Sequence, residues 1–203
     1  MALTDKLTAI ANAIRGKTGS TDPMTLDEMP SAIDGIPDLL EVRITNNLTE
    51  YVNHRITKIH DTAFGNCTAL VKLHLPNMTG GASYCFQNCR SLVDYDFSSV
   101  RSFGAYAFTG CKGLTKMYLP SLTYLHNRIF SGCTSLDTII MPITSRIVGI
   151  DNIYVFENTP IASGTGYIYV PRALVDGYKT ATNWSNFANQ IRAIEDYPEI
   201  CGG

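Results

Sequence analysis

Apolar residues in the central part of the chain recur at a fixed interval of 22 residues. Phenylalanine occupies one column, cysteine the next and leucine the third: Phe64, Phe86, Phe108 and Phe130; Cys67, Cys89, Cys111 and Cys133; Leu70, Leu92, Leu114 and Leu136. Two more apolar columns close each unit, and proline follows in three of them: Leu73, Tyr95, Met117 and Ile139; Leu75, Phe97, Leu119 and Met141; Pro76, Pro120 and Pro142. A repeat of this length predicts a solenoid, in which each unit forms one coil stacked on its neighbour.

The end of each unit predicts a strand. Apolar residues such as Leu73 and Leu75 alternate with polar ones there, which is the period of a half-buried strand, and equivalent strands of stacked coils would pair in parallel. A period of 22 lies in the range of leucine-rich repeats. We therefore expect an α+β solenoid of the leucine-rich-repeat class, with one short parallel strand per coil, over residues 37–170 with degenerate terminal coils.

The repeat weakens towards the C-terminus. Phe156 follows Phe130 by 26 residues, which predicts a four-residue insertion within residues 145–152, and Thr159 stands where a cysteine is expected. A strand should end at Pro171, and residues 171–194 have the pattern of a helix. We expect residues 171–203 to form a C-terminal helical cap and tail over the last coil.

The first 36 residues have a different pattern. Leu3, Leu7, Ile10 and Ile14 recur at spacings of four, three and four residues, which predicts the apolar face of a short amphipathic helix. A helix of about 14 residues is marginal in water on its own, so this face needs a cover. A second helix, the first coil or further copies in a homo-oligomer would each provide one. We assign residues 1–36 to a helical attachment or oligomerisation segment.

Composition and charge narrow the classes of partner. Of 203 residues 45% are hydrophobic, and 16 basic and 18 acidic side chains give a formal net charge of −2. This balance gives no general attraction to phosphate backbones or anionic lipid, so no nucleic acid is expected as a partner. No stretch approaches about 18 consecutive apolar residues, so no membrane insertion is expected. Asp5 and Lys6 interrupt the opening residues, which we therefore do not interpret as a signal peptide.

The cysteines and histidines indicate neither a metal nor a cofactor. Side chains stacked across parallel strands start about 4.8 Å apart, farther than the roughly 3.8 Å between the Cβ atoms of a disulfide, so the cysteine column should hold buried free thiols. Cys201 in the terminal tail is the expected reactive thiol. His60 and His126 share a repeat position but lie three coils apart, too far to bind one metal ion. We expect no catalytic residue.

One pair of carboxylates keeps an enzymatic alternative open. Asp94 and Asp96 should point to the same side of one strand, about 7 Å apart, which could resemble the carboxylate pair of a glycosidase. We interpret them as part of a solvated strand face and keep a glycan hydrolase as the remote alternative.

The strand residues between the buried leucines should point away from the core. They form the candidate binding face: Lys72, His74, Asp94, Asp96, Lys116, Tyr118, Thr138 and Ile140. Mixed charge with one aromatic ring suits a protein or glycan contact, and it also suits ordinary surface. Tyr84 and Tyr106 form a second exposed column on the opposite side, for which the same two interpretations stay open.

Two segments resemble known proteins. The unit A-F-x-x-C-x-x-L-x-x-L-x-L-P, carried by Ala63 to Pro76 and by Ala107 to Pro120, is similar to the BspA-like leucine-rich-repeat family, and roughly residues 56–171 share that resemblance. Residues 168–184 look like the closing segment of that family, whose members are surface or secreted adhesion proteins without implied catalytic residues. Residues 7–33 resemble a segment near the start of bacteriophage virion and tail-associated proteins.

Together the two resemblances imply a non-enzymatic phage virion structural protein, associated with the tail or baseplate. It would present its repeats to a host surface protein or glycan, or to another virion protein. Such a protein assembles in the host cytoplasm and is located in the virion. The alternative is a bacterial cell-surface adhesion or scaffold protein of the same repeat family.

Overall fold

A computed structural model describes residues 48–200. The chain divides into two compact units, Met1–Val42 and Arg43–Gly203. The predicted N-terminal helix with Leu3, Leu7, Ile10 and Ile14, the phage-like segment at residues 7–33 and Cys201 all lie outside the described residues. Within residues 48–200, none of the helices has the length and apolar character needed to span a bilayer.

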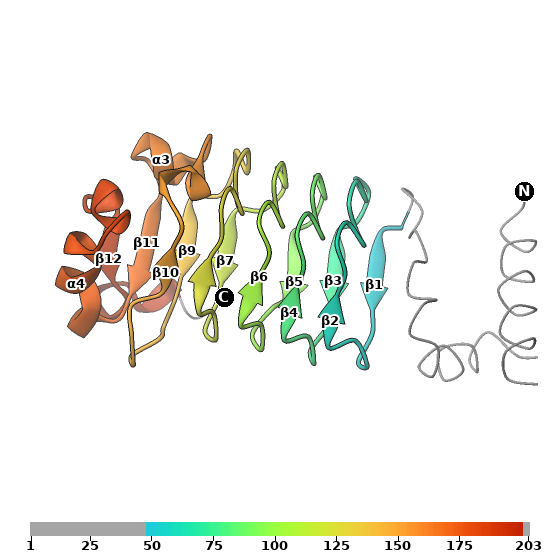
Figure 1. Cartoon of the computed structure of the whole chain (residues 1–203), viewed down its shortest axis with the longest axis horizontal. Helices are drawn as coiled ribbons and strands as arrows, with labels where there is room; N and C mark the ends of the chain where they lie inside the picture. Colours follow the sequence, from blue (N-terminus) through green and yellow to red (C-terminus); the bar gives the residue numbers. More distant parts are fainter. Residues whose placement is uncertain (1–47, 201–203) are drawn as a thin grey trace, which may run out of the picture. The chain divides into compact units, whose positions relative to one another are not determined.

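The described residues wind into stacked coils whose short strands lie side by side in parallel (Figure 1). One set of strands comprises β1 (Glu50–Val52), β3 (Lys72–His74), β5 (Asp94–Asp96), β7 (Lys116–Tyr118), β9 (Thr138–Ile140), β11 (Tyr167–Val170) and β12 (Ile191–Ala193). A second set comprises β2 (Lys58–Ile59), β4 (Gly80–Gly81), β6 (Ser102–Phe103), β8 (Tyr124–Leu125) and β10 (Gly149–Ile150). The parallel leucine-rich-repeat fold is confirmed, but the coils from β1 to β10 carry two strands each where the sequence predicted one.

The strand register follows the sequence repeat. Leu73 pairs with Tyr95 and Met117 with Ile139, so residues 22 apart in sequence are neighbours across the sheet. These central residues of each strand point into the stack, while the residues on either side of them point outwards. The repeat therefore fixes which side chains of each strand lie in the core and which lie on the surface.

The first set of strands is divided into two sheets between β5 and β7. The strand order is β1-β3-β5 in one sheet and β12-β11-β9-β7 in the other. At the break, the hydroxyl of Tyr95 donates a hydrogen bond to the carbonyl oxygen of Lys116. Burial raises the pKa of Tyr95 to about 12. A tyrosine thus occupies a position where its neighbours have Leu73 and Met117, and its hydroxyl, not a strand amide, bonds to β7.

A stack of phenylalanine rings forms the centre of the coils. Ring centroids are separated by 5.5 Å between Phe64 and Phe86, by 5.1 Å between Phe86 and Phe108, and by 5.7 Å between Phe108 and Phe130. Phe156 continues the stack at 6.0 Å from Phe130 despite the insertion. Each such pair contributes about 0.5–1.5 kcal/mol beyond its burial, so the stack links every coil to the next.

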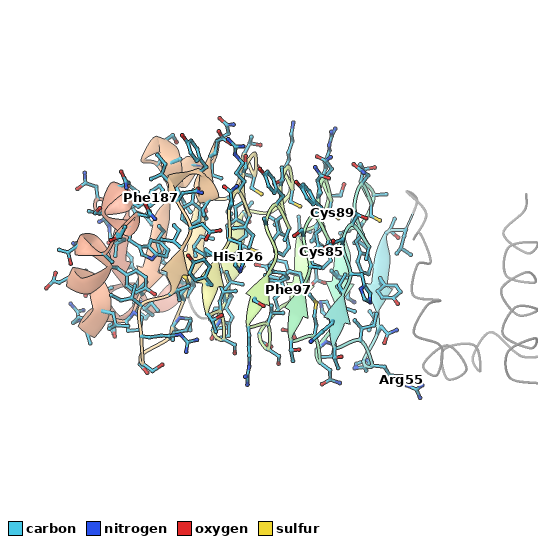
Figure 2. All side chains as sticks on the ribbon, viewed as in Figure 1. Arg55, Cys85, Cys89, Phe97, His126 and Phe187 are labelled. Atoms are coloured by element: carbon cyan, nitrogen blue, oxygen red, sulfur yellow. The ribbon has the colours of Figure 1, made fainter. Side chains whose placement is uncertain are left out.

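The cysteine column lies beside this stack, in the interior. Cys67, Cys89, Cys111 and Cys133 are buried and free, as the sequence predicted, and Cys85 is buried and free as well. Figure 2 shows Cys85 and Cys89 within the coils, together with Phe97. Burial raises the pKa of Cys67 to about 11, and it also raises the pKa of Cys85 and Cys111. Burial therefore holds these three thiols in their neutral form.

Each coil turns through two backbone positions in the left-handed region. One follows the buried phenylalanine by two residues and is always asparagine or glycine: Asn66, Asn88, Gly110, Gly132 and Asn158. These are the residue types that adopt a positive φ most readily. The other position precedes the phenylalanine by two residues and holds Thr62, Tyr84, Tyr106 and Arg128, with φ between 52° and 60°. A bulky residue in this conformation costs on the order of 1–3 kcal/mol.

The insertion after β9 is absorbed by the C-terminal residues. The Trp184 indole donates to the carbonyl oxygen of Val148 over 2.7 Å, and the Val148 amide donates to the Tyr178 hydroxyl over 2.8 Å. Thr159 does not bond to the previous coil as the cysteines do. Its side chain donates to the Phe156 carbonyl oxygen and accepts from the amide of Ala162, so it caps the helix α3 (Pro160–Ser163).

The single helix predicted over residues 171–194 is wrong in its second half. The structure has the 3₁₀ turn η2 (Arg172–Leu174), the six-residue helix α4 (Val175–Thr180) and the 3₁₀ turn η3 (Trp184–Phe187), followed by strand β12 beside β11. Ile191 and Ala193 are buried while Arg192 between them is not, which is the two-residue period of a strand. Two more 3₁₀ turns end the described chain, η4 (Ile194–Asp196) and η5 (Pro198–Ile200), and η1 (Ile153–Phe156) precedes α3.

Candidate binding surfaces

The outward side chains of β1, β3, β5, β7 and β9 form a surface that we call the strand face. Its first row carries Glu50, Lys72, Asp94 and Lys116 at equivalent positions of β1, β3, β5 and β7, so that the sign of the charge alternates from strand to strand. Lys72 Nζ lies 2.8 Å from a Glu50 carboxylate oxygen, and this contact raises the pKa of Lys72. The row is therefore polar but nearly neutral in charge.

The second row of the strand face mixes apolar and polar side chains. It holds Val52, His74, Asp96 and Tyr118, of which Tyr118 is 40% exposed. Its His74 Nε2 lies 2.7 Å from Oδ1 of Asp94 in the first row. This β1–β5 part of the face extends farther than predicted, to Glu50 and Val52. The pairing of Tyr51 with Leu73, 22 residues later, is the sequence signal for that extension.

The two carboxylates considered for glycoside cleavage each have a structural partner. Asp94 Oδ1 bonds to His74, and Asp96 Oδ1 accepts a hydrogen bond from the Ser98 amide over 2.9 Å. The Ser98 contact ties Asp96 to the turn after β5. Both residues thus lie on one strand as predicted, in contacts that hold the local backbone and the neighbouring strand.

The other end of the strand face is covered by the C-terminal tail, residues 194–200. The ring of Tyr197 lies 5.3 Å from that of Tyr169, and Lys116 Nζ donates to the carbonyl oxygen of Ile200 over 2.6 Å. The assignment of Ile140 to an exposed binding face is wrong, because Ile140 is 0% exposed. Its neighbour Tyr169, in register on β11, is only 6% exposed. Both belong to the outward row, and the tail that returns to this part of the sheet accounts for their burial.

Thr138 lies at the margin of the covered region. It is half-buried, and its hydroxyl donates to the carboxylate of Asp137 over 2.7 Å. Of the predicted binding residues, Lys72, His74, Asp94 and Asp96 therefore lie together on β3 and β5, whereas Lys116, Thr138 and Ile140 lie towards the tail.

A second surface follows the turns of the coils. It comprises the residues two positions before each buried phenylalanine, Thr62, Tyr84, Tyr106, Arg128 and Tyr154, and we call it the turn column. The rings of Tyr84 and Tyr106 are stacked with centroids 4.8 Å apart and planes within 9° of parallel. The Arg128 guanidinium lies 5.1 Å from the centroid of the Tyr154 ring. Tyr84 and Tyr106 were predicted as a column, and the structure extends it by two coils.

The charge of Arg128 is compensated within the turn column. Its Nε lies 3.1 Å from Oε2 of Glu157, and the same oxygen accepts a hydrogen bond from the Ser131 hydroxyl over 3.0 Å. A hydrogen bond with the Tyr106 side chain and the charge of Glu157 both raise the pKa of Arg128. Sequence reasoning missed Arg128 and Tyr154 because the insertion shifts the register, although counting back two residues from Phe130 and Phe156 finds them.

The histidines are spread over different contacts. His60 is exposed, and His126 Nδ1 lies 3.5 Å from the Asp151 carboxylate beside the ring of Tyr124. Across residues 48–200, no three or more histidine, cysteine, aspartate or glutamate side chains cluster in a way that could hold a metal ion.

Comparison with known proteins supports the fold. The family described as "BspA type Leucine rich repeat region (6 copies)" matches residues 41–162. A leucine-rich repeat protein from Bacteroides ovatus ATCC 8483 is similar in structure with a TM-score of 0.50 and 23% identity, over 74% of this chain and 41% of that one. A leucine rich cell surface protein from Faecalibacterium prausnitzii A2-165 gives a TM-score of 0.40 and 20% identity, over 72% and 48%. The chain spans less than half of each of these proteins. No curated protein matches it.

Proposed function

Because the chain belongs to the BspA-type leucine-rich-repeat family, we propose that it is a non-enzymatic binding module whose strand face contacts a protein or glycan on another surface. The observation that carries this proposal is the uncovered part of the strand face over β1, β3 and β5. Solenoids commonly bind through such extended sheet surfaces, because stacked strands present equivalent side chains in rows.

The chemistry of this uncovered part suits a protein contact. Glu50, Lys72 and Asp94 alternate in charge along one row, and the exposed side chain of Val52 lies in the next. A partner with the opposite order of charges could exchange its ion pairs with these residues and cover the apolar side chain. Reversing the order should therefore weaken binding more than deleting a charge. Lys72→Glu is the test variant and Lys112→Glu, on an exposed turn, is its matched control.

We place this module in a phage particle, as a structural protein of the tail or baseplate. The support is the resemblance of residues 7–33 to virion proteins, with residues 1–36 as the segment that attaches to the particle or to further copies of the chain. In this arrangement the repeats contact a neighbouring virion protein or the host surface. Mass spectrometry of purified particles tests the location, and absence of the chain from particles that contain their other tail proteins would refute it.

The attachment segment has a separate test. The full chain and a chain lacking residues 1–36 are compared by their mass in solution. A larger assembly that falls to a monomer on deletion supports oligomerisation through this segment. Monomers in both cases would refute it and leave attachment to another virion protein, which co-purification of the full chain with particles would test.

The second candidate is an adhesion or scaffold protein on a bacterial surface. It is favoured by the extent of the family match, which covers residues 41–162 and includes the whole strand face. This proposal predicts labelling of the chain by a membrane-impermeant amine reagent on intact cells. Recovery of the chain in particles and not on cells would decide against it.

A further inference from the structure

The two left-handed positions of each coil differ in a way that folding alone does not explain. Asparagine or glycine occupies the position after each phenylalanine, as the backbone requires. At the position before it, where the same residues would also be least strained, Tyr84, Tyr106 and Arg128 occur in three successive coils. Strain kept at successive coils points to a use for the side chains themselves.

The contacts along the turn column describe that use. Tyr84 stacks on Tyr106, and Arg128 lies over the ring of Tyr154, so aromatic and cationic groups alternate along the stack. At the first end the preceding coil has only the short Thr62. At the other end Tyr154 is 48% exposed and Ile153 beside it is 43% exposed. The column therefore presents apolar ring surface and phenolic hydroxyls to solvent along a line.

The charge of the column selects a class of ligand. The Arg128 guanidinium is paired with Glu157, so the surface offers hydrogen-bond donors and acceptors without a net charge from this pair. Sugar rings match this chemistry, because their C–H faces pack on aromatic rings while their hydroxyls bond to charged and phenolic groups. A polyanion would instead need an unpaired cation. The line of coils favours an extended chain over a single sugar.

We propose that the turn column, from Tyr84 to Tyr154, is a binding site for a neutral polysaccharide that runs along the stack of coils. This site is separate from the strand face and does not depend on whether the chain acts on a virion or on a cell. It assigns a role to Arg128 and Tyr154, which the strand-face proposal does not use.

The test is affinity electrophoresis of the full chain through gels that contain mannan, β-1,3-glucan or galactan, with alginate as the charged comparison. Tyr106→Asn is the decisive variant, since asparagine adopts the left-handed backbone with less strain and should not unfold the coil. Tyr118→Asn on the strand face is the matched control, and thermal melting of each variant verifies folding. We expect at least one neutral polysaccharide to retard the parent chain, about a tenfold loss of affinity for Tyr106→Asn and no change for Tyr118→Asn.

Several results would overturn the proposal. They are passage of the parent chain through all three neutral gels without retardation, retardation by alginate alone, and equal retardation of Tyr106→Asn and the parent. Loss of binding in Tyr118→Asn alone would move the site to the strand face. A chain that binds polysaccharide but is absent from particles would refute the virion role and leave this site intact.

Discussion

The thiol of Cys111 donates a hydrogen bond to the carbonyl oxygen of Phe86, one coil earlier, over 3.0 Å. The same contact joins Cys89 to Phe64 over 3.1 Å and Cys133 to Phe108 over 3.0 Å. The cysteine of each unit thus has a geometric role besides filling space, because a small donor at this position connects the turn of one coil to the next. This accounts for a column of cysteine without any disulfide.

Replacing Cys111 with alanine should lower the free energy of unfolding by about 1–3 kcal/mol, since it removes a buried sulfur and its hydrogen bond. Urea denaturation followed by circular dichroism measures the change. Thr134→Ala, at an exposed position of the following turn, should stay within about 0.5 kcal/mol of the parent. Equal stability of the Cys111 variant and the parent would contradict the role assigned to the thiol.

The buried thiols should make the fold sensitive to alkali. Burial raises the pKa of Cys67 from 9.0 to about 11, so between these values the unfolded chain loses its thiol proton while the folded chain keeps it. The stabilisation is complete below pH 9 and is lost as the pH rises towards 11. Urea midpoints measured from pH 7.5 to 10.5 should fall above about pH 9. Cys67→Ala should show a shallower fall over the same interval, and an unchanged slope would refute the assignment.

Phe108 should be among the most costly positions to truncate. It is fully buried and its ring lies 4.7 Å from that of Phe103 and 5.1 Å from that of Phe86. Phe108→Ala should therefore lower the free energy of unfolding by about 3–5 kcal/mol. Chemical denaturation provides the measurement, with Tyr118→Ala on the surface as the control. A loss below about 1 kcal/mol would mean that the ring stack does not hold the coils together.

Removing the C-terminal tail should expose apolar surface on the strand face. A chain ending at Ala193 lacks Tyr197 and the backbone that accepts from Lys116, so Ile140 and Tyr169 should become accessible. We expect increased fluorescence of a hydrophobic dye with the parent's circular dichroism spectrum largely kept. Tyr197→Ala should give a smaller change in the same direction. No increase with the truncated chain would show that other residues bury Ile140.

The parts of the fold that repeat could be predicted from the sequence. The columns headed by Phe64, Cys67 and Leu70 occupy the buried positions that their spacing indicates, because every coil meets the same neighbours. Even Phe156 could be placed in the stack, since the four-residue insertion lies in a loop and leaves the ring position unchanged.

The features that escaped prediction depend on contacts between distant residues. Burial of Ile140 accompanies a tail whose last described residue, Ile200, bonds to Lys116, 84 positions earlier, and no local pattern encodes that return. Strand β12 was read as helix because its apolar residues also suit a helical stripe until β11 provides a strand partner. The turn column was found only at Tyr84 and Tyr106, where the period is undisturbed.

The substitution of tyrosine at position 95 has a mechanical consequence. Strands β5 and β7 share no ladder, and on the other sheet β6 and β8 are joined by the single pair Ser102 and Tyr124. Both edges of the molecule are therefore weakest at the same level, where the turns and ring stack carry most of the connection. A force pulling along the pile of coils would part it there first, so this seam sets the load at which such a tether yields.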